Sequence, residues 1–96
     1  MRTIHEYPFE EASVILKAAA HPVRLKILAL LEDKSMKVGD IQRMAGVKQS
    51  ITSQHLAELM SRGILGRERK GNEVYYHIKK KEVLGILSCI KKCCKN

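Results

Sequence analysis

The stretch VGDIQRMAGVKQSITSQHLAELMSR, residues 38–62, decides the fold. Its apolar residues recur at helical spacing on both sides of Gly46, a residue suited to a left-handed turn between two helices. We expect the first helix over about Lys37–Ala45, with Val38, Ile41 and Met44 inward, and the second over about Gln49–Arg62. The inward stripe of the second helix is expected to be Ile51, Leu56, Leu59 and Met60. The pattern predicts a helix-turn-helix.

The outward face of the second helix carries small polar groups. A surface helix that needs only to be soluble usually carries Lys and Glu there. Hydroxyl and amide groups can instead approach a base edge closely and hydrogen-bond it. The outward residues are Ser50, Ser53, Gln54, Ala57 and Ser61. This face predicts a helix that reads DNA.

A basic hairpin, Arg67 to Ile78, follows the second helix directly, with strand-forming residues on both sides of the Gly71-Asn72 turn. A helix-turn-helix followed by a hairpin is the layout of a winged-helix DNA reader. We therefore expect a mainly α fold with a small β-hairpin, built as four helices, two strands and a last helix. One domain is expected over residues 1–96, with the helix-turn-helix at about 38–62 and the wing at about 65–78.

Three further helices complete this expected domain, at about 9–20, 22–32 and 80–95. The last should carry one apolar stripe, since Val83, Leu87, Ile90 and Cys94 recur at helical spacing. Residues 1–8 are expected to form no regular secondary structure, and residues 33–36 are expected to connect two helices. A chain of 96 residues buries only about 60–65% of its unfolded surface, so its core is marginal. We expect the helices at about 9–20 and 80–95 to pair with a second copy as a homodimer.

The residues expected to touch DNA fall in two groups. In helix-turn-helix readers the start of the second helix reaches the bases, which selects Lys48, Gln49, Ser50, Ser53 and Gln54. Gln can pair with adenine through two hydrogen bonds, and Ser can bond several base edges. On the hairpin, Arg67, Arg69 and Lys70 are placed to straddle the adjacent backbone or minor groove. The alternative for each residue is a solvated surface position.

His55 lies towards the apolar stripe on a helical wheel. From the residues alone, a partly buried, hydrogen-bonded histidine is favoured over a base reader or a metal ligand.

The charge distribution suits a polyanionic partner, because phosphate contacts dominate affinity for nucleic acid. The net charge is +8. Residues 37–78 carry seven positive and four negative charges, and residues 79–96 carry six and one. The expected helix-turn-helix and wing, within residues 37–78, are therefore modestly basic, and residues 79–96 (the tail) are more strongly basic. The alternative for the tail is a solvated helix face with cations near its negative C-terminal end.

Several classes of protein are disfavoured. No apolar run approaches the roughly 20 residues of a membrane span, and acidic residues interrupt the N-terminus where a signal peptide would be apolar. Three Cys without a spaced framework argue against a secreted disulfide scaffold and favour a reducing cytoplasm. We expect no enzyme, because the four His are scattered and no Gly-rich phosphate loop is present.

From about Leu16 to Ile78 the chain resembles the arsenic-repressor (ArsR) family of small dimeric winged-helix repressors. The resemblance rests on AAAHPVRLKILALL, KVGDIQ, QSITSQHLAELMSRGIL and RKGNEVYYHI taken together. It implies a cytoplasmic homodimer on double-stranded DNA with an inverted-repeat operator, released by a ligand or by thiol chemistry. It also implies that Gln49, Ser50, Ser53 and His55 belong to the reading motif. Lys48 departs from the pattern, because family members often have a capping Ser there.

The resemblance excludes some effector sites. Many arsenic-sensing relatives carry Cys-Val-Cys-Asp on the third helix, where this chain has Lys37-Val38-Gly39-Asp40. The last helix lacks the Asp and His of zinc-sensing relatives. Relatives that sense persulfides need a cysteine near the second helix, and none precedes position 89.

Cys89, Cys93 and Cys94 remain as a candidate effector site. Three thiolates suit a soft ion such as As(III), Sb(III), Cd(II) or Cu(I). A regular helix spreads three sulfurs at these spacings, so binding requires a frayed last turn or a thiol from the other subunit. The alternatives are thiol oxidation or sulfur modification, and no effector role. More remote alternatives for the whole chain are a protein-interaction winged helix and a thiol-based metal buffer without DNA binding.

Overall fold

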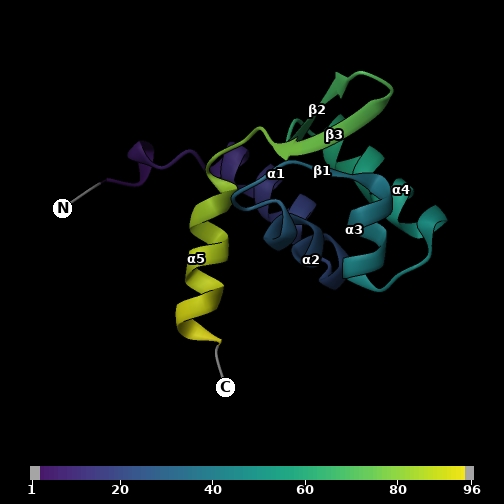
Figure 1. Ribbon diagram of the computed structural model, residues 1–96. Coiled ribbons are helices and arrows are strands. Elements are labelled where there is room, and N and C mark those ends of the chain that lie inside the picture. The colour runs from purple at the N-terminus through teal and green to yellow at the C-terminus, as the bar shows by residue number, and fades with distance from the viewer. Residues whose placement is uncertain (1–2, 95–96) are drawn as a thin grey trace.

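The computed structural model describes residues 3–94. Figure 1 shows a helical body with the β2–β3 hairpin at one end, while α5 runs along one side and ends away from that hairpin. The described elements are η1 (Ile4–Glu6), α1 (Phe9–Ala19), α2 (Pro22–Leu30), β1 (Met36–Lys37), α3 (Val38–Ala45), α4 (Gln49–Ser61), β2 (Leu65–Lys70), β3 (Glu73–Ile78) and α5 (Val83–Cys93). This is the predicted mainly α, winged helix-turn-helix architecture, with one additional short strand.

Local residue chemistry sets the helix ends. Pro22 occupies the first turn of α2, where a missing N–H does no harm, and the Nδ1 atom of His21 accepts a hydrogen bond from the Val23 N–H at 3.1 Å. Gly46 ends α3 with φ of 74°, the left-handed conformation that glycine adopts without strain. The turn between α3 and α4 is therefore as short as predicted.

The sheet has the order β1-β3-β2 and is antiparallel. The hairpin was predicted, but β1 was not, because Met36 and Lys37 were expected as a connection and a helix start. Met36 pairs with Tyr76 and Lys37 with Tyr75, so β1 adds to the free edge of β3. A strand of two residues has no periodicity of its own, and its partner lies far away in the sequence.

The last helix begins later than predicted, at Val83 instead of about residue 80. The N–H groups of Lys79 and Lys80 donate to the carbonyl of Ile64 at 2.9 and 3.1 Å. These bonds hold the chain against the end of the sheet and delay the helix. The predicted end at about residue 95 lies outside the described residues, and α5 ends at Cys93.

The core lies between α2, α3, α4, the base of the sheet and one side of α1 and α5. Its fully buried large side chains are Ile27, Leu28, Ile41, Leu56, Leu59, Ile64, Leu65 and Val83, with Thr52 among them. None of the helices within residues 3–94 is long and apolar enough to cross a bilayer.

Two predicted core positions are wrong, and one residue of the predicted α5 stripe lies beyond the helix. Met44 is 60% exposed because α3 buries Ile41 and Ala45, one turn apart, which points Met44 away from the core. Ile51 is 39% exposed because α4 buries Thr52, Leu56 and Leu59 instead. Cys94 is exposed, since it follows the last residue of α5 and does not continue its buried stripe.

Apolar side chains are exposed along α1. Phe9 is 51% exposed and Leu16 is 56% exposed, and both lie on the same side of α1 by helical spacing. Leu16 and Ala12 line a mainly apolar hollow of about 300 Å³ with Ile86 of α5. We call this surface, made by Phe9, Ala12, Leu16 and Ile86, the α1/α5 face.

Candidate functional site

The structure places the predicted reading residues on one exposed side of α4. Gln49, Ser50, Ser53 and Gln54 are all exposed, together with Ala57 and Ser61 of the same side. The opposite side is fixed by burial of Leu56, Leu59 and Thr52. The Thr52 hydroxyl donates to the Lys48 carbonyl at 3.0 Å, so this buried polar group is satisfied inside the helix. The outward direction of the small polar residues is thus set by the core.

Lys48 precedes the first residue of α4 and is exposed. It occupies the N-cap position without a capping side-chain bond within the described part of the chain. The helix nevertheless starts at Gln49, where the sequence predicted it. The departure from a capping Ser therefore leaves the helix boundary unchanged.

The wing cations do not share one face. Arg67 and Arg69 are two residues apart on β2, so their side chains leave the same face of the strand, and Lys70 leaves the other. All three are exposed. The Lys70 ammonium lies 5.4 Å from the centre of the Tyr75 ring, within cation–π range. Arg67 and Arg69 thus form a pair, and Lys70 is held separately at the hairpin end.

The helix α4 and the wing border a common hollow of about 580 Å³. From α4 it is lined by Ser53, Ala57, Met60 and Ser61, and from the sheet by Arg67 and Tyr76. A hydroxyl face and a guanidinium therefore open into one concave surface. This surface has the donors needed to hold a phosphate backbone beside a base edge.

The wing has side-chain contacts on both of its edges. Lys37 of β1 forms an ion pair with Glu73 at 3.0 Å, and the Glu73 carboxylate raises the pKa of Lys37. On the other edge, Gly66 faces His77, and a β-carbon at position 66 would lie 2.7 Å from His77 Nε2. A larger residue at position 66 would therefore require the His77 imidazole to move.

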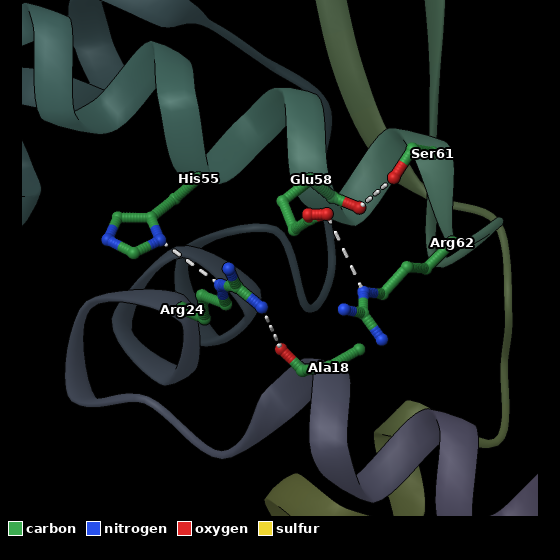
Figure 2. Close-up of polar contacts among 6 residues, drawn as sticks. All are labelled: Ala18, Arg24, His55, Glu58, Ser61 and Arg62. Carbon is green, nitrogen blue, oxygen red and sulfur yellow. Dashed lines mark hydrogen bonds and ion pairs between the residues drawn. The ribbon is translucent and has the colours of Figure 1, made fainter.

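His55 is half-buried and turned away from the exposed face of α4. Its Nδ1 atom accepts a hydrogen bond from Arg24 Nε at 3.1 Å, as Figure 2 shows. Burial lowers the pKa of the His55 imidazole, and the neighbouring His21 and Arg24 lower it further. This is the partly buried, hydrogen-bonded histidine favoured from the residues alone.

Arg24 was missed as a functional residue by sequence reasoning. Besides His55 it bonds the Ala18 carbonyl at 3.1 Å, so it contacts both α1 and α4 from α2. A signal was present, because Arg24 lies three and four residues before Ile27 and Leu28, which are fully buried. A cation on the buried side of a helix needs a partner there.

Two of the three cysteines lie together. Cys89 and Cys93, one turn apart on α5, have their Sγ atoms 4.0 Å apart, and both are exposed free thiols. Cys94 is also a free, exposed thiol but is not part of this pair. Within residues 3–94 no group of three or more His, Cys, Asp or Glu is arranged to hold a metal ion. The structure therefore brings together two of the three predicted ligands.

Residues 21–66 match the family model described as bacterial regulatory protein, arsR family. The transcriptional repressor PagR of Bacillus anthracis is 38% identical over 82 residues, which cover 84% of this chain and 82% of PagR. YgaV of Escherichia coli is named a transcriptional regulator, PagR a transcriptional repressor and HlyU of Vibrio cholerae a transcriptional activator.

Solved structures agree with this match. HlyU from Vibrio cholerae superposes with a TM-score of 0.83 at 32% identity, over 94% of this chain and 99% of HlyU. Mb0332 from Mycobacterium bovis is described as a homodimeric winged helix-turn-helix DNA-binding domain. It superposes with a TM-score of 0.77 at 27% identity, over 90% of this chain and 80% of Mb0332.

Proposed function

The chain belongs to the ArsR family of bacterial regulatory proteins, and we propose that within this family it is a repressor that binds an inverted-repeat operator as a homodimer. The family and the winged helix-turn-helix fold make it a DNA-binding transcription regulator. PagR, which is named a repressor, supports the direction of regulation. A two-fold dimer presents two reading helices to half-sites about 34 Å apart, which accounts for an inverted repeat. The site of action is the cytoplasm, where the DNA is.

One observation carries the proposal: Ser53 of α4 and Arg67 of the wing line the same hollow. We assign base contacts to Gln49, Ser50, Ser53 and Gln54, and a contact to a phosphate or a guanine to Lys48. Arg67 and Arg69 share a face of β2 and are assigned to the backbone or minor groove beside the reading helix, with Lys70 at the hairpin end. His55 is not assigned a base contact, because it is half-buried and bonded to Arg24.

The test is fluorescence anisotropy with two DNA duplexes of equal length. One has the sequence upstream of the chain's own gene (the upstream duplex), and the other has a random sequence (the random duplex). Gln49→Ala and Ser53→Ala are expected to weaken binding to the upstream duplex by about tenfold or more each, since a good base contact contributes about 1–3 kcal/mol. Binding to random DNA should be unchanged. Arg67→Ala should weaken binding to both duplexes and lower the salt slope by about one, the value expected for a single phosphate.

Lys92→Ala is the matched control for the charge change. Lys92 is exposed near the end of α5, away from the hairpin, so its removal should alter neither affinity. Equal losses on both duplexes for Gln49→Ala and Ser53→Ala, or no loss at all, would exclude α4 as the reading helix.

The second copy is proposed to cover the α1/α5 face. Phe9 and Leu16 are large apolar side chains and are more than half exposed in the single chain. Burying them against a partner would add stability. The hollow beside Leu16 gives the partner chain's apolar side chains a place to pack. Mb0332, described as homodimeric, has the same fold.

The effector is proposed to be a soft metal or metalloid ion, such as As(III) or Sb(III), at the cysteines of α5. Thiolates are the ligands that soft ions prefer. The Sγ atoms of Cys89 and Cys93 are 4.0 Å apart, so both could bind one ion. Cys94 would complete the set after a movement of the last turn, or the third thiolate would come from the other subunit. An ion held by all three cysteines of one chain would therefore require the last turn of α5 to unwind.

The same pair supports a second candidate, reversible oxidation. A peroxide would oxidise one thiolate to a sulfenic acid, and the second thiol would displace water to give a disulfide. The 4.0 Å contact between the two sulfurs favours this over oxidation of Cys94 alone.

Release of the upstream duplex by arsenite, Cd(II) and hydrogen peroxide separates the candidates. Wild type should be released by arsenite or Cd(II), Cys89→Ser/Cys93→Ser should resist release, and peroxide should have no effect on either. Cys94→Ser is the matched control, expected to keep at least part of the response. Release by peroxide alone, with loss of two hydrogens from the protein mass, would replace the metal by oxidation. Unchanged release of the double variant would remove the cysteine pair from both schemes.

A further inference from the structure

One guanidinium joins three helices. Arg24 is half-buried in the first turn of α2. Its Nη1 group donates to the Ala18 carbonyl near the end of α1, and its Nε group donates to His55 Nδ1 in the middle of α4. Figure 2 shows the side chain lying between the end of α1 and α4. Arg24 therefore connects the helix of the α1/α5 face with the reading helix.

The bond from Arg24 fixes the protonation state of His55. Arginine has donors only, so Nδ1 of His55 must offer a lone pair, which leaves the ring neutral with its proton on Nε2. A protonated imidazole carries N–H on both nitrogens and cannot accept this bond. The tie between α1, α2 and α4 therefore exists only while His55 is neutral.

The surroundings oppose a positive charge on His55. The His21 ring centre lies 4.4 Å from that of His55, and Arg24 carries a permanent charge. On α4 itself, Glu58 is the acidic neighbour, but its carboxylate faces Arg62 at 3.8 Å. Arg24, His55 and Glu58 line an open hollow of about 460 Å³, which leaves the imidazole accessible to protons from water. Burial lowers the pKa of His55, and the neighbouring His21 and Arg24 lower it further.

We propose that Arg24 is a positioning residue for DNA recognition, which holds α4 at a fixed rotation through neutral His55, and that protonation of His55 releases this hold. His55 directly follows Ser53 and Gln54 in the chain, so any rotation of α4 about its axis that moves His55 also moves their outward side chains. Base contacts depend on that rotation, whereas phosphate contacts by long cations tolerate it. This inference rests on the proposed DNA-binding function.

The experiment measures the ratio of affinities for the upstream and random duplexes at pH 7.5 and 5.5 and constant salt. Wild type should have a lower ratio at pH 5.5 than at pH 7.5, and the loss should reach about tenfold once His55 is fully protonated, the scale of one hydrogen bond to a charged group. Arg24→Lys keeps the positive charge but removes the planar guanidinium that makes both hydrogen bonds. Its affinity ratio should therefore be low at both pH values. His55→Asn offers an amide oxygen near the position of Nδ1 and does not titrate, so its ratio should stay high at both.

His21 needs its own control, because its Nδ1 atom also accepts a hydrogen bond, from the Val23 N–H. His21→Asn keeps a capping acceptor without titration and should retain the wild-type pH response. A pH response that disappears in His21→Asn, or persists in His55→Asn, would overturn the assignment to His55. A wild-type ratio in Arg24→Lys would overturn the role of Arg24.

A second readout needs no DNA and separates this inference from the proposed function. Nitrogen-15 spectra of the histidine rings at pH 7.5 should show His55 unprotonated at Nδ1 in wild type and a mixture of tautomers in Arg24→Lys. Failure of wild type to bind any duplex would contradict the proposed function but would leave this ring assignment standing. A His55 proton on Nδ1 in wild type would contradict the inference even if DNA binding holds.

Discussion

The reading side of the molecule and the α1/α5 face differ in what they leave exposed. On the reading side, α4 buries Leu56 and Leu59 and exposes hydroxyls and amides. On the α1/α5 face, the exposed groups include the apolar side chains of Phe9 and Leu16. The first surface exposes polar groups that suit a polar ligand. On the second, covering the exposed apolar side chains would add stability, and this supports the proposed second copy.

The two regions also differ in how their cations are used. Residues 79–96 carry the larger excess of positive charge, yet Lys80 is paired with Glu11 at 3.2 Å and Lys91 with Glu32 at 3.0 Å. On the wing, Arg67 and Arg69 point from the same face of β2. The net charge of a segment therefore does not show how many of its cations are free of an ion pair, and the placement of each cation has to be considered.

The largest expected effect is on the free energy of unfolding, and it distinguishes the core behind α4 from the α1/α5 face. Leu59→Ala removes a fully buried side chain from the core behind α4 and should lower the free energy of unfolding by about 2–5 kcal/mol. Leu16→Ala changes a side chain that is 56% exposed and should cost well under about 1 kcal/mol at low protein concentration. Urea denaturation monitored by circular dichroism measures both. Equal losses at high dilution would show that the α1/α5 face is buried within a single chain.

An intermediate effect is expected from pH at the junction of the two regions. Because the folded state lowers the pKa of His55, the unfolded chain binds more protons just below its ordinary value of about 6.5. Stability from this group is thus complete above about pH 6.5 and is lost as pH falls from there through the lower, folded-state pKa. Urea midpoints of wild type and His55→Asn should diverge between pH 7 and 5, with wild type falling more. Parallel curves would assign the acid sensitivity to other groups.

The smallest effect is expected from the Lys91–Glu32 pair, which ties α5 to the end of α2. Its lysine is largely exposed, and such pairs contribute about 0–1 kcal/mol and less at high salt. Lys91→Ala should therefore change the melting temperature slightly in dilute buffer and not at all at high salt. A large change that salt does not remove would mean that the pair is buried by the partner chain.

The sequence was a good guide to the reading side and a weaker one to the rest. The helical spacing and Gly46 located α3 and α4 to within a residue, because local patterns determine both. The outward polar residues followed from the same spacing. Ile51 and Met44 were misplaced because a helical wheel ranks apolar residues by type, whereas the core selected Thr52 and Ala45 by fit.

The remaining features depend on contacts between distant residues. β1 is defined only by its pairing with β3, and the late start of α5 depends on Ile64. The bonds from Arg24 to Ala18 and His55 join three helices, and the nearest signal in the sequence was a lone cation on an apolar side. The pairing of Cys89 with Cys93 follows from their spacing, whereas the direction of Cys94 depends on where the helix ends.

The most direct test is the mass of the complex between protein and upstream duplex, measured by sedimentation equilibrium for wild type and Leu16→Asp. Wild type should place two chains on one duplex. Leu16→Asp puts a charge on the α1/α5 face, and should remain folded, sediment as a single chain and lose about a hundredfold or more in affinity, because each chain then binds one half-site alone. A wild-type complex with one chain per duplex, or a monomeric Leu16→Asp variant with wild-type affinity, would contradict the account.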